Sequence, residues 1–136
     1  MGIRSVRISR AALEAVAVHA RETAPRECCG LLLGTADRIL ESVRTQNIAA
    51  SPDRFEVDPK DHIQIRRQAR ERGLIVAGVY HSHPHSAPYP SATDLAESSY
   101  EDYLCLIVGL NDGHANARLF RLERETFAEI DLVIEA

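Results

Sequence analysis

Two histidines separated by one residue, His81 and His83, have the types and spacing that most plainly suggest chemistry. They follow an apolar run, residues 74–80 with the sequence LIVAGVY, that is typical of a buried strand. Side chains two positions apart on a strand point to the same face, so both imidazoles would project to one side of the sheet. Pro84 then limits further strand pairing. The pair therefore predicts two nitrogen ligands presented at close range by a rigid element.

A catalytic zinc ion takes three protein ligands and keeps a fourth position for water. Asp94 is the candidate third ligand, because it lies in the first turn of a helix predicted over residues 92–100 and because Pro88 and Pro90 stiffen the preceding loop. Two imidazoles and a carboxylate are a reasonable donor set for Zn²⁺. Ser91 and Asp94 are also spaced as a helix-capping pair. Capping and ligation can coexist, since capping would fix the direction of the carboxylate.

Hydrolysis also needs a group that takes a proton from the attacking water and delivers it to the leaving amine. Glu27 begins an apolar run, residues 27–34 with the sequence ECCGLLLG, that is predicted to be a buried strand. An ionised carboxylate there is costly without a partner, and metal-bound water would be one. Taken alone, Glu27 would more often be an edge or turn carboxylate. Cys28 and Cys29 would point to opposite faces of the strand, so we interpret both as small buried hydrophobic residues.

The remaining elements must position these residues, and hydrophobic periodicity predicts them as helices and short strands. Ser9 can cap a helix over residues 10–22, and Asp58-Pro59 can begin another that runs to about Arg72. We therefore expect an α/β fold with a mixed, largely antiparallel curved β-sheet flanked by helices. The other predicted features are strands at residues 5–9, 38–47, 103–110, 117–122 and 127–134 and a turn at Asn111-Asp112-Gly113.

The composition is that of a globular protein. The 136 residues are 45% hydrophobic and 26% charged, and they predict a single domain over residues 1–136 that buries its own core. The formal net charge of −4 argues against a nucleic-acid binder held by a basic face. The three cysteines contain no C-x-x-C pair, and we recognise neither a signal peptide nor a run that spans a membrane. We expect a cytoplasmic protein that binds neither nucleic acid nor membrane.

The compound motif resembles that of the JAMM family, also called MPN-plus or JAB1/MPN/Mov34 metalloenzymes. That motif has an upstream glutamate and then H-x-H, seven residues and S-x-x-D, here in HSHPHSAPYPSATDL. The resemblance is to the small prokaryotic members, and it implies a JAB1/MPN-like, cytidine-deaminase-like architecture. It implies that His81, His83 and Asp94 bind Zn²⁺. It further implies that Glu27 is the general acid/base acting on the zinc-bound water and that Ser91 helps to hold the oxyanion.

The reaction implied by this resemblance is hydrolysis of the bond after the C-terminal glycine of a ubiquitin-like protein. The small prokaryotic members act on ubiquitin-like sulfur carriers, so the implied partner is a sulfur carrier protein or a peptide substrate. His85 is not a ligand position in the family, and we interpret it as a loop residue at the mouth of the site.

Two alternatives compete with this function. The first is a non-catalytic MPN-fold scaffold or binding protein, although that branch of the family has usually lost the metal ligands. The second is a RadC-like protein with a nucleic-acid-related role, which shares a similar metal motif but is disfavoured by the negative charge. A nucleobase deaminase is not expected, because H-x-E and P-C-x-x-C are both missing. An exposed sheet edge could also pair two copies into a homodimer.

Overall fold

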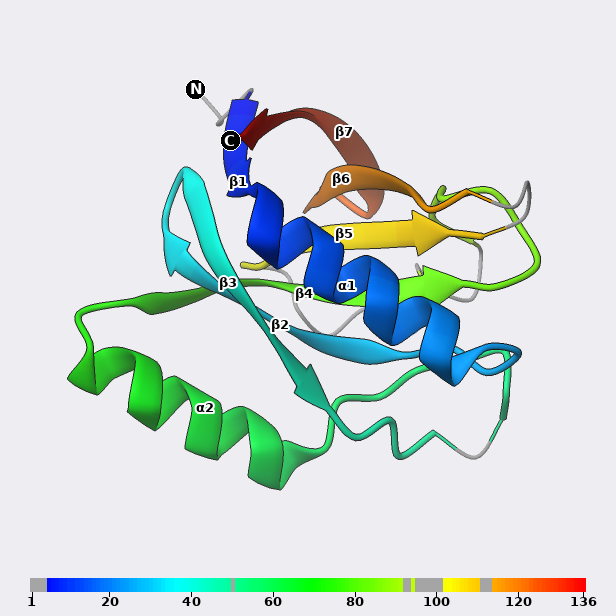
Figure 1. The fold of residues 1–136 in the computed structure, drawn as a ribbon, viewed down its shortest axis with the longest axis horizontal. Helices are drawn as coiled ribbons and strands as arrows, with labels where there is room; N and C mark the ends of the chain where they lie inside the picture. The colour runs from blue at the N-terminus through cyan, green and yellow to red at the C-terminus, as the bar shows by residue number, and fades with distance from the viewer. Residues whose placement is uncertain (1–4, 50, 92–93, 95–101, 111–113) are drawn as a thin grey trace.

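Strands and helices follow one another in the order β-α-β-β-α-β-β-β-β in the computed structural model, which describes residues 5–49, 51–91, 94, 102–110 and 114–136 (Figure 1). The helices are α1 (Arg10–Thr23) and α2 (Pro59–Glu71). None of the described helices has the length and apolar character needed to cross a membrane. The strands are β1 (Ser5–Ser9), β2 (Cys29–Thr35), β3 (Arg38–Thr45), β4 (Ile75–His83), β5 (Leu104–Gly109), β6 (Asn116–Glu123) and β7 (Thr126–Glu135).

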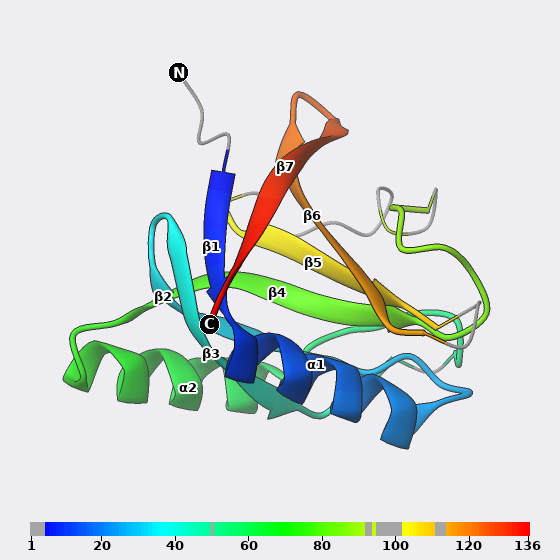
Figure 2. The ribbon, with the colours of Figure 1, turned by 45° about the horizontal axis from the view of Figure 1, so that its top comes forward.

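The described strands form one sheet in the order β1-β3-β2-β4-β5-β6-β7, and this sheet closes on itself. Closure depends on β1, which pairs in parallel with β3 on one side and with β7 on the other. β4 and β5 are also parallel, whereas β2 is antiparallel to β3 and β4, and β6 is antiparallel to β5 and β7. Figure 2 shows β7 running alongside β1, with the C-terminus near the start of α1.

The predicted α/β class, with a mixed sheet flanked by helices, is confirmed. One detail differs, because the sheet is a closed barrel and not an open curved sheet. The reason is the parallel pairing of the first and last strands, which local periodicity does not reveal. Within the described strands, the edge that was expected to pair two copies is therefore covered. The homodimer itself stays an untested prediction.

Helix α1 packs against one face of the sheet, and every strand contributes at least one buried side chain to this contact cluster (Figure 1). The Ser9 side chain begins the helix by accepting a hydrogen bond from the Ala12 N–H at 3.1 Å, as predicted for a helix cap. Ala12, Val16 and Ala20 recur at helical spacing and are buried. The strand residues that join them in the largest core cluster are Val6, Ile8, Leu32, Ile39, Tyr80, Leu104, Leu106, Val108, Leu119 and Ile130.

Helix α2 covers the opposite face of the sheet over β2 and β4. The Asp58 carboxylate accepts a hydrogen bond from the Lys60 N–H at 2.9 Å, and Pro59 occupies the first helical position, as predicted. Ile65 and Ala69 are the buried residues of this highly polar helix. They belong to a second core cluster with Cys29, Leu31, Leu33, Val57 and Val79.

The sheet differs from the prediction at the ends of two strands that matter for the site. β4 does not end at Tyr80 but continues to His83, where it still pairs with β5 at Gly109. β2 begins at Cys29, so Glu27 lies just before the strand and not on it. The turn predicted at residues 111–113, and the helix predicted over residues 92–100 apart from Asp94, lie outside the described residues.

Candidate metal centre

Strand β4 presents His81 and His83 on one face, close to its C-terminal end. The alternation of the strand explains this, because Tyr80 faces α1 whereas Val79 faces α2, and the two histidines continue the second series. β4 lies between β2 and β5, and His81 is paired on both sides, with Cys29 and Ile107. Neither histidine residue is exposed by more than 5%. Both rings therefore stand on a buried, doubly paired strand.

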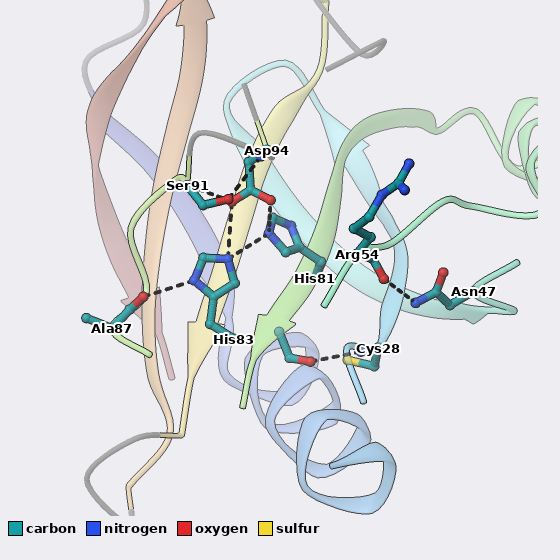
Figure 3. A network of polar contacts seen from close by, with 9 residues as sticks. Cys28, Asn47, Arg54, His81, His83, Ala87, Ser91 and Asp94 are labelled. Atoms are coloured by element: carbon teal, nitrogen blue, oxygen red, sulfur yellow. Dashed lines mark hydrogen bonds and ion pairs between the residues drawn. The ribbon is translucent and has the colours of Figure 1, made fainter. Parts of the chain in front are cut away.

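The two imidazoles meet the carboxylate of Asp94 (Figure 3). His81 Nε2 lies 3.2 Å from His83 Nε2. Asp94 places Oδ1 at 3.3 Å from His81 Nε2 and Oδ2 at 3.1 Å from His83 Nε2. Three ligands at tetrahedral angles, each about 2.0–2.1 Å from a zinc ion, would lie about 3.3 Å from one another. The donor types, and a separation within 4.8 Å for one ligand atom from each residue, thus fit the zinc ion that the resemblance implies.

Asp94 is held in its direction by Ser91. The Ser91 N–H donates to Asp94 Oδ2 at 2.8 Å, and the Asp94 N–H donates to Ser91 Oγ at 3.0 Å. This reciprocal pair is the hydrogen bonding of a capping box, with aspartate in the acidic position. The capping and ligand interpretations therefore coexist, as the sequence led us to expect. Because Ser91 Oγ is the acceptor in this pair, its hydroxyl hydrogen can still be donated to another group.

Burial and mutual contact set the charges of the three residues. Burial lowers the pKa of His81, which keeps that imidazole neutral and able to offer a lone pair. Burial disfavours the Asp94 carboxylate, but hydrogen bonds from His81 and His83 outweigh it and hold the pKa of Asp94 far below its usual range. At His83 burial acts to lower the pKa, but the Asp94 carboxylate and the Ala87 carbonyl together raise it. Metal binding would replace the proton that His83 shares with Asp94.

Two contacts to the histidines were not predicted from the sequence. The carbonyl oxygen of Ala87 lies 3.0 Å from His83 Nδ1, within hydrogen-bonding distance (Figure 3). The ring of Phe55 stacks on His81, with centroids 4.2 Å apart and an angle of 15° between the planes. Phe55 lies in the segment between β3 and α2, and only the folding of that segment brings it to β4. A single phenylalanine in a turn-rich stretch carries no sequence signal for this contact.

Glu27 is fixed through its backbone just before β2. Its N–H donates to the Pro52 carbonyl at 3.3 Å, and its carbonyl accepts from Asn47 Nδ2 at 3.0 Å. The next residue is tied to β4 twice, because the Cys28 N–H donates to Ser82 Oγ at 2.8 Å and the Ser82 N–H donates to the Cys28 carbonyl at 3.2 Å. Figure 3 shows Cys28 close to the strand that carries the histidines. Glu27 is thereby held beside the histidine end of β4.

The side chain of Glu27 is buried, with 7% of the residue exposed, and within the described residues Oε1 has no hydrogen-bond partner. Burial raises the pKa of Glu27 to about 7, with a smaller opposing effect from His83 and a further increase from Asp94 and Asp53. A carboxyl group with a pKa near neutrality is suited to taking up and releasing a proton. The structure thus brings Glu27 within electrostatic range of the histidine–aspartate cluster.

Cys28 and Cys29 are both buried free thiols. Cys28 belongs to the core cluster on the α1 side and Cys29 to the cluster on the α2 side, which confirms that they point to opposite faces. Burial raises the pKa of Cys28 to about 11 and that of Cys29 to about 12, so both remain uncharged thiols near neutral pH. His85 is exposed in the loop after β4.

The structure combines a closed mixed sheet that has a helix on each face with a cluster of two histidines and one aspartate at the end of β4. These features occur together with the sequence motif. The chain belongs to the family described as prokaryotic homologs of the JAB domain, whose model matches residues 9–123. The matched residues include Glu27, the two histidines, Ser91 and Asp94. The resemblance inferred from the motif is confirmed.

Individual relatives match over most of this chain. The desampylase of Haloferax volcanii is 35% identical over 140 residues, which cover 96% of this chain and 99% of the relative. The CysO-cysteine peptidase of Mycobacterium tuberculosis is 30% identical over 104 residues, which cover 75% of this chain and 71% of the relative. The solution structure of a protein from Desulfitobacterium hafniense superimposes with a TM-score of 0.88 at 25% identity, covering 96% of this chain and 92% of that one.

Proposed function

We propose that this chain is a zinc-dependent peptidase that hydrolyses the bond after the C-terminal glycine of a ubiquitin-like sulfur carrier protein. The observation that carries the proposal is the buried carboxyl group of Glu27 within electrostatic range of three candidate ligand residues, whose ligand atoms lie within 4.8 Å of one another. The names of the relatives, a desampylase and a CysO-cysteine peptidase, support this class of reaction. The complete ligand set disfavours the non-catalytic scaffold.

Each residue has a distinct part in the proposed reaction. His81, His83 and Asp94 hold Zn²⁺, which when bound would polarise the scissile carbonyl group and lower the pKa of the attacking water. Glu27 takes a proton from that water while the water oxygen bonds to the carbonyl carbon of the terminal glycine. Negative charge then develops on the carbonyl oxygen, where the Ser91 hydroxyl donates a hydrogen bond. Glu27 delivers the proton to the leaving nitrogen as the C–N bond breaks, so the carrier ends in a glycine carboxylate.

The proposal is tested by replacing Glu27 while keeping the metal ligands. Sulfur carrier fusions whose C-terminal glycine is followed by a short peptide are incubated with zinc-loaded wild type and Glu27→Gln, and the products are read by mass spectrometry. We expect about one zinc ion per chain in both proteins, and a loss of cleavage of about 10²–10⁴-fold in the variant, because the proton can no longer be transferred. Glu14→Gln, at an exposed position on α1, is the matched control and should cleave as wild type does.

Three results would count against the proposal. Full cleavage by Glu27→Gln would show that the Glu27 carboxyl group is not the general acid/base. A wild-type protein that binds no zinc, even when prepared without chelator, would restore the scaffold as the better interpretation. Binding of DNA at moderate salt in a gel-shift experiment would instead favour the nucleic-acid-related alternative.

A further inference from the structure

The two candidate zinc-binding histidines are supported in different ways on the side away from Asp94. His83 has the common arrangement, in which the ring nitrogen that does not face the metal donates to a backbone carbonyl, here that of Ala87 at 3.0 Å. This bond fixes both the tautomer and the orientation of the His83 ring. Loss of such an outer contact typically lowers metal affinity by about 10–100-fold.

His81 lacks this arrangement. Its Nδ1 is fully buried and has no hydrogen-bond partner within the described residues. The nearest described aromatic group is the Phe55 ring, which lies almost parallel to the imidazole at a centroid distance of 4.2 Å. Stacked rings at this separation attract each other beyond the burial of their surfaces. At His81, stacking by Phe55 therefore has the supporting role that the hydrogen bond to Ala87 has at His83.

The segment that carries Phe55 makes several hydrogen bonds to one side chain, that of Asn47. Its Nδ2 group donates to the Arg54 carbonyl at 2.9 Å (Figure 3) and to the Glu27 carbonyl at 3.0 Å. Its Oδ1 atom accepts from the N–H groups of Ala49 and Glu56, at 3.0 and 2.9 Å. One asparagine thus binds the backbone on both sides of Phe55 and the backbone of the candidate catalytic carboxyl residue.

We propose that Phe55 is a positioning residue that holds the His81 imidazole in its metal-binding orientation by stacking, and that Asn47 sets the place of Phe55. The inference rests on the proposed function, because it requires His81 to be a zinc ligand. Phe55 is half-buried and also packs against the core cluster that contains Val57 and Val79. A purely structural role for Phe55 is therefore the competing interpretation, and the test must separate the two.

The test measures metal affinity and stability independently of activity. Metal-free wild type, Phe55→Leu and Phe55→Tyr are titrated with Co²⁺ and Zn²⁺ in competition with a chromogenic chelator, and thermal unfolding is recorded without metal. Phe127→Leu is the matched control, because Phe127 packs edge-on against Phe120 in a separate core cluster. Phe55→Leu should bind both metals about tenfold more weakly, at the lower end of the range for outer contacts. Phe55→Tyr should recover most of the affinity, and Phe127→Leu should bind as wild type does.

Asn47 supplies a second measurement. If it acts through Phe55, Asn47→Ala should also weaken Co²⁺ binding, and the double variant with Phe55→Leu should lose less affinity than the two single losses combined. Unchanged metal affinity in Phe55→Leu, together with a lowered melting temperature like that of Phe127→Leu, would overturn the inference while leaving the proposed function intact. A wild type that binds neither metal would overturn the proposed function and this inference with it.

Discussion

At the scale of single residues, the site holds two carboxyl groups whose surroundings move their pKa values apart. Glu27 is buried without a hydrogen-bond partner within the described residues, and its pKa rises to about 7. Asp94 is also removed from water, but hydrogen bonds from the two histidines and the Ser91 N–H keep it ionised. Surroundings that separate the pKa values of two carboxyl groups in this way suit the groups to different chemical roles. One can carry a proton near neutral pH, and the other stays a permanent anion for a cation to bind.

The raised pKa of Glu27 predicts that the free energy of unfolding of the metal-free protein decreases as the pH rises. In the unfolded chain the glutamate ionises near pH 4.5, whereas in the folded protein it keeps its proton to about pH 7. The unfolded state therefore loses its proton first, and the free energy of unfolding falls as the pH rises through this window. At about 1.4 kcal/mol per pKa unit the loss is about 3 kcal/mol by pH 8.

Urea unfolding of metal-free wild type and Glu27→Gln between pH 4 and 8 measures this cost. Titrating groups that are not coupled to Glu27 contribute alike to both proteins, so the difference between the two curves reports Glu27 together with its coupling to His83 and Asp94. We expect Glu27→Gln to become the more stable protein as the pH approaches 8. Curves that stay parallel over the whole range would show that the Glu27 pKa is not raised.

At the scale of elements, the site depends on the junction between the residues before β2 and the end of β4. Ser82 makes this junction, because its hydroxyl accepts from the Cys28 N–H and its backbone donates to the Cys28 carbonyl. Ser82 points away from the candidate metal site, since it alternates with His81 and His83 along the strand. Ser82, which lies between the two histidines, thus joins β4 to the residues that precede β2, where Glu27 lies.

Replacing Ser82 by alanine should destabilise the protein and slow cleavage. The Cys28 N–H would lose its buried acceptor, which costs about 1–3 kcal/mol. Because Glu27 is the neighbouring residue, we also expect a lower kcat, with zinc content unchanged. Urea unfolding, turnover of the carrier fusion and zinc content check the three expectations. Ser5→Ala, at an exposed position on β1, should change the unfolding free energy by less than about 0.5 kcal/mol; an equally small change in Ser82→Ala would contradict the role of the junction.

The sequence predicted most elements to within a few residues, because each is marked by local periodicity and by caps such as Ser9 and Asp58. It also predicted the gathering of His81, His83 and Asp94, since strand alternation and a capped turn are local properties. It did not predict that β4 stays paired with β5 as far as His83. Nor did it predict the stack of Phe55 on His81 or the bonds of Asn47, because these contacts depend on how an irregular segment returns to the sheet.

At the scale of the whole molecule, the barrel is completed by its first strand. β1 pairs with both β3 and β7, and Val6 and Ile8 bury their side chains completely in the largest core cluster. The strand that carries the two histidines is therefore part of one continuous hydrogen-bonded ring. The stability of the candidate metal centre is coupled in this way to residues far from it in the fold.

A substitution in β1 should consequently affect the whole protein. Ile8→Ala removes a fully buried side chain, and we expect it to lower the free energy of unfolding by about 2–5 kcal/mol. Ile63→Ala makes the same change at a position of α2 that is 59% exposed, and it should alter stability by no more than about 0.5 kcal/mol. Chemical denaturation of the two variants and wild type measures both free energies of unfolding. Equal losses of stability in the two variants would contradict the importance of β1 for the stability of the barrel.

The parallel pairing of β1 with β7, from Ser5 with Asp131 to Ser9 with Glu135, also bears on when the protein can fold in a cell. Contacts that join such distant parts of a chain form slowly, because a long loop must close before they are made. During translation β1 emerges first and can pair with β3, but its other side has no partner until β7 has left the ribosome. Completion of the barrel, and with it the final rigidity of the strand that carries the two histidines, therefore waits for the synthesis of β7.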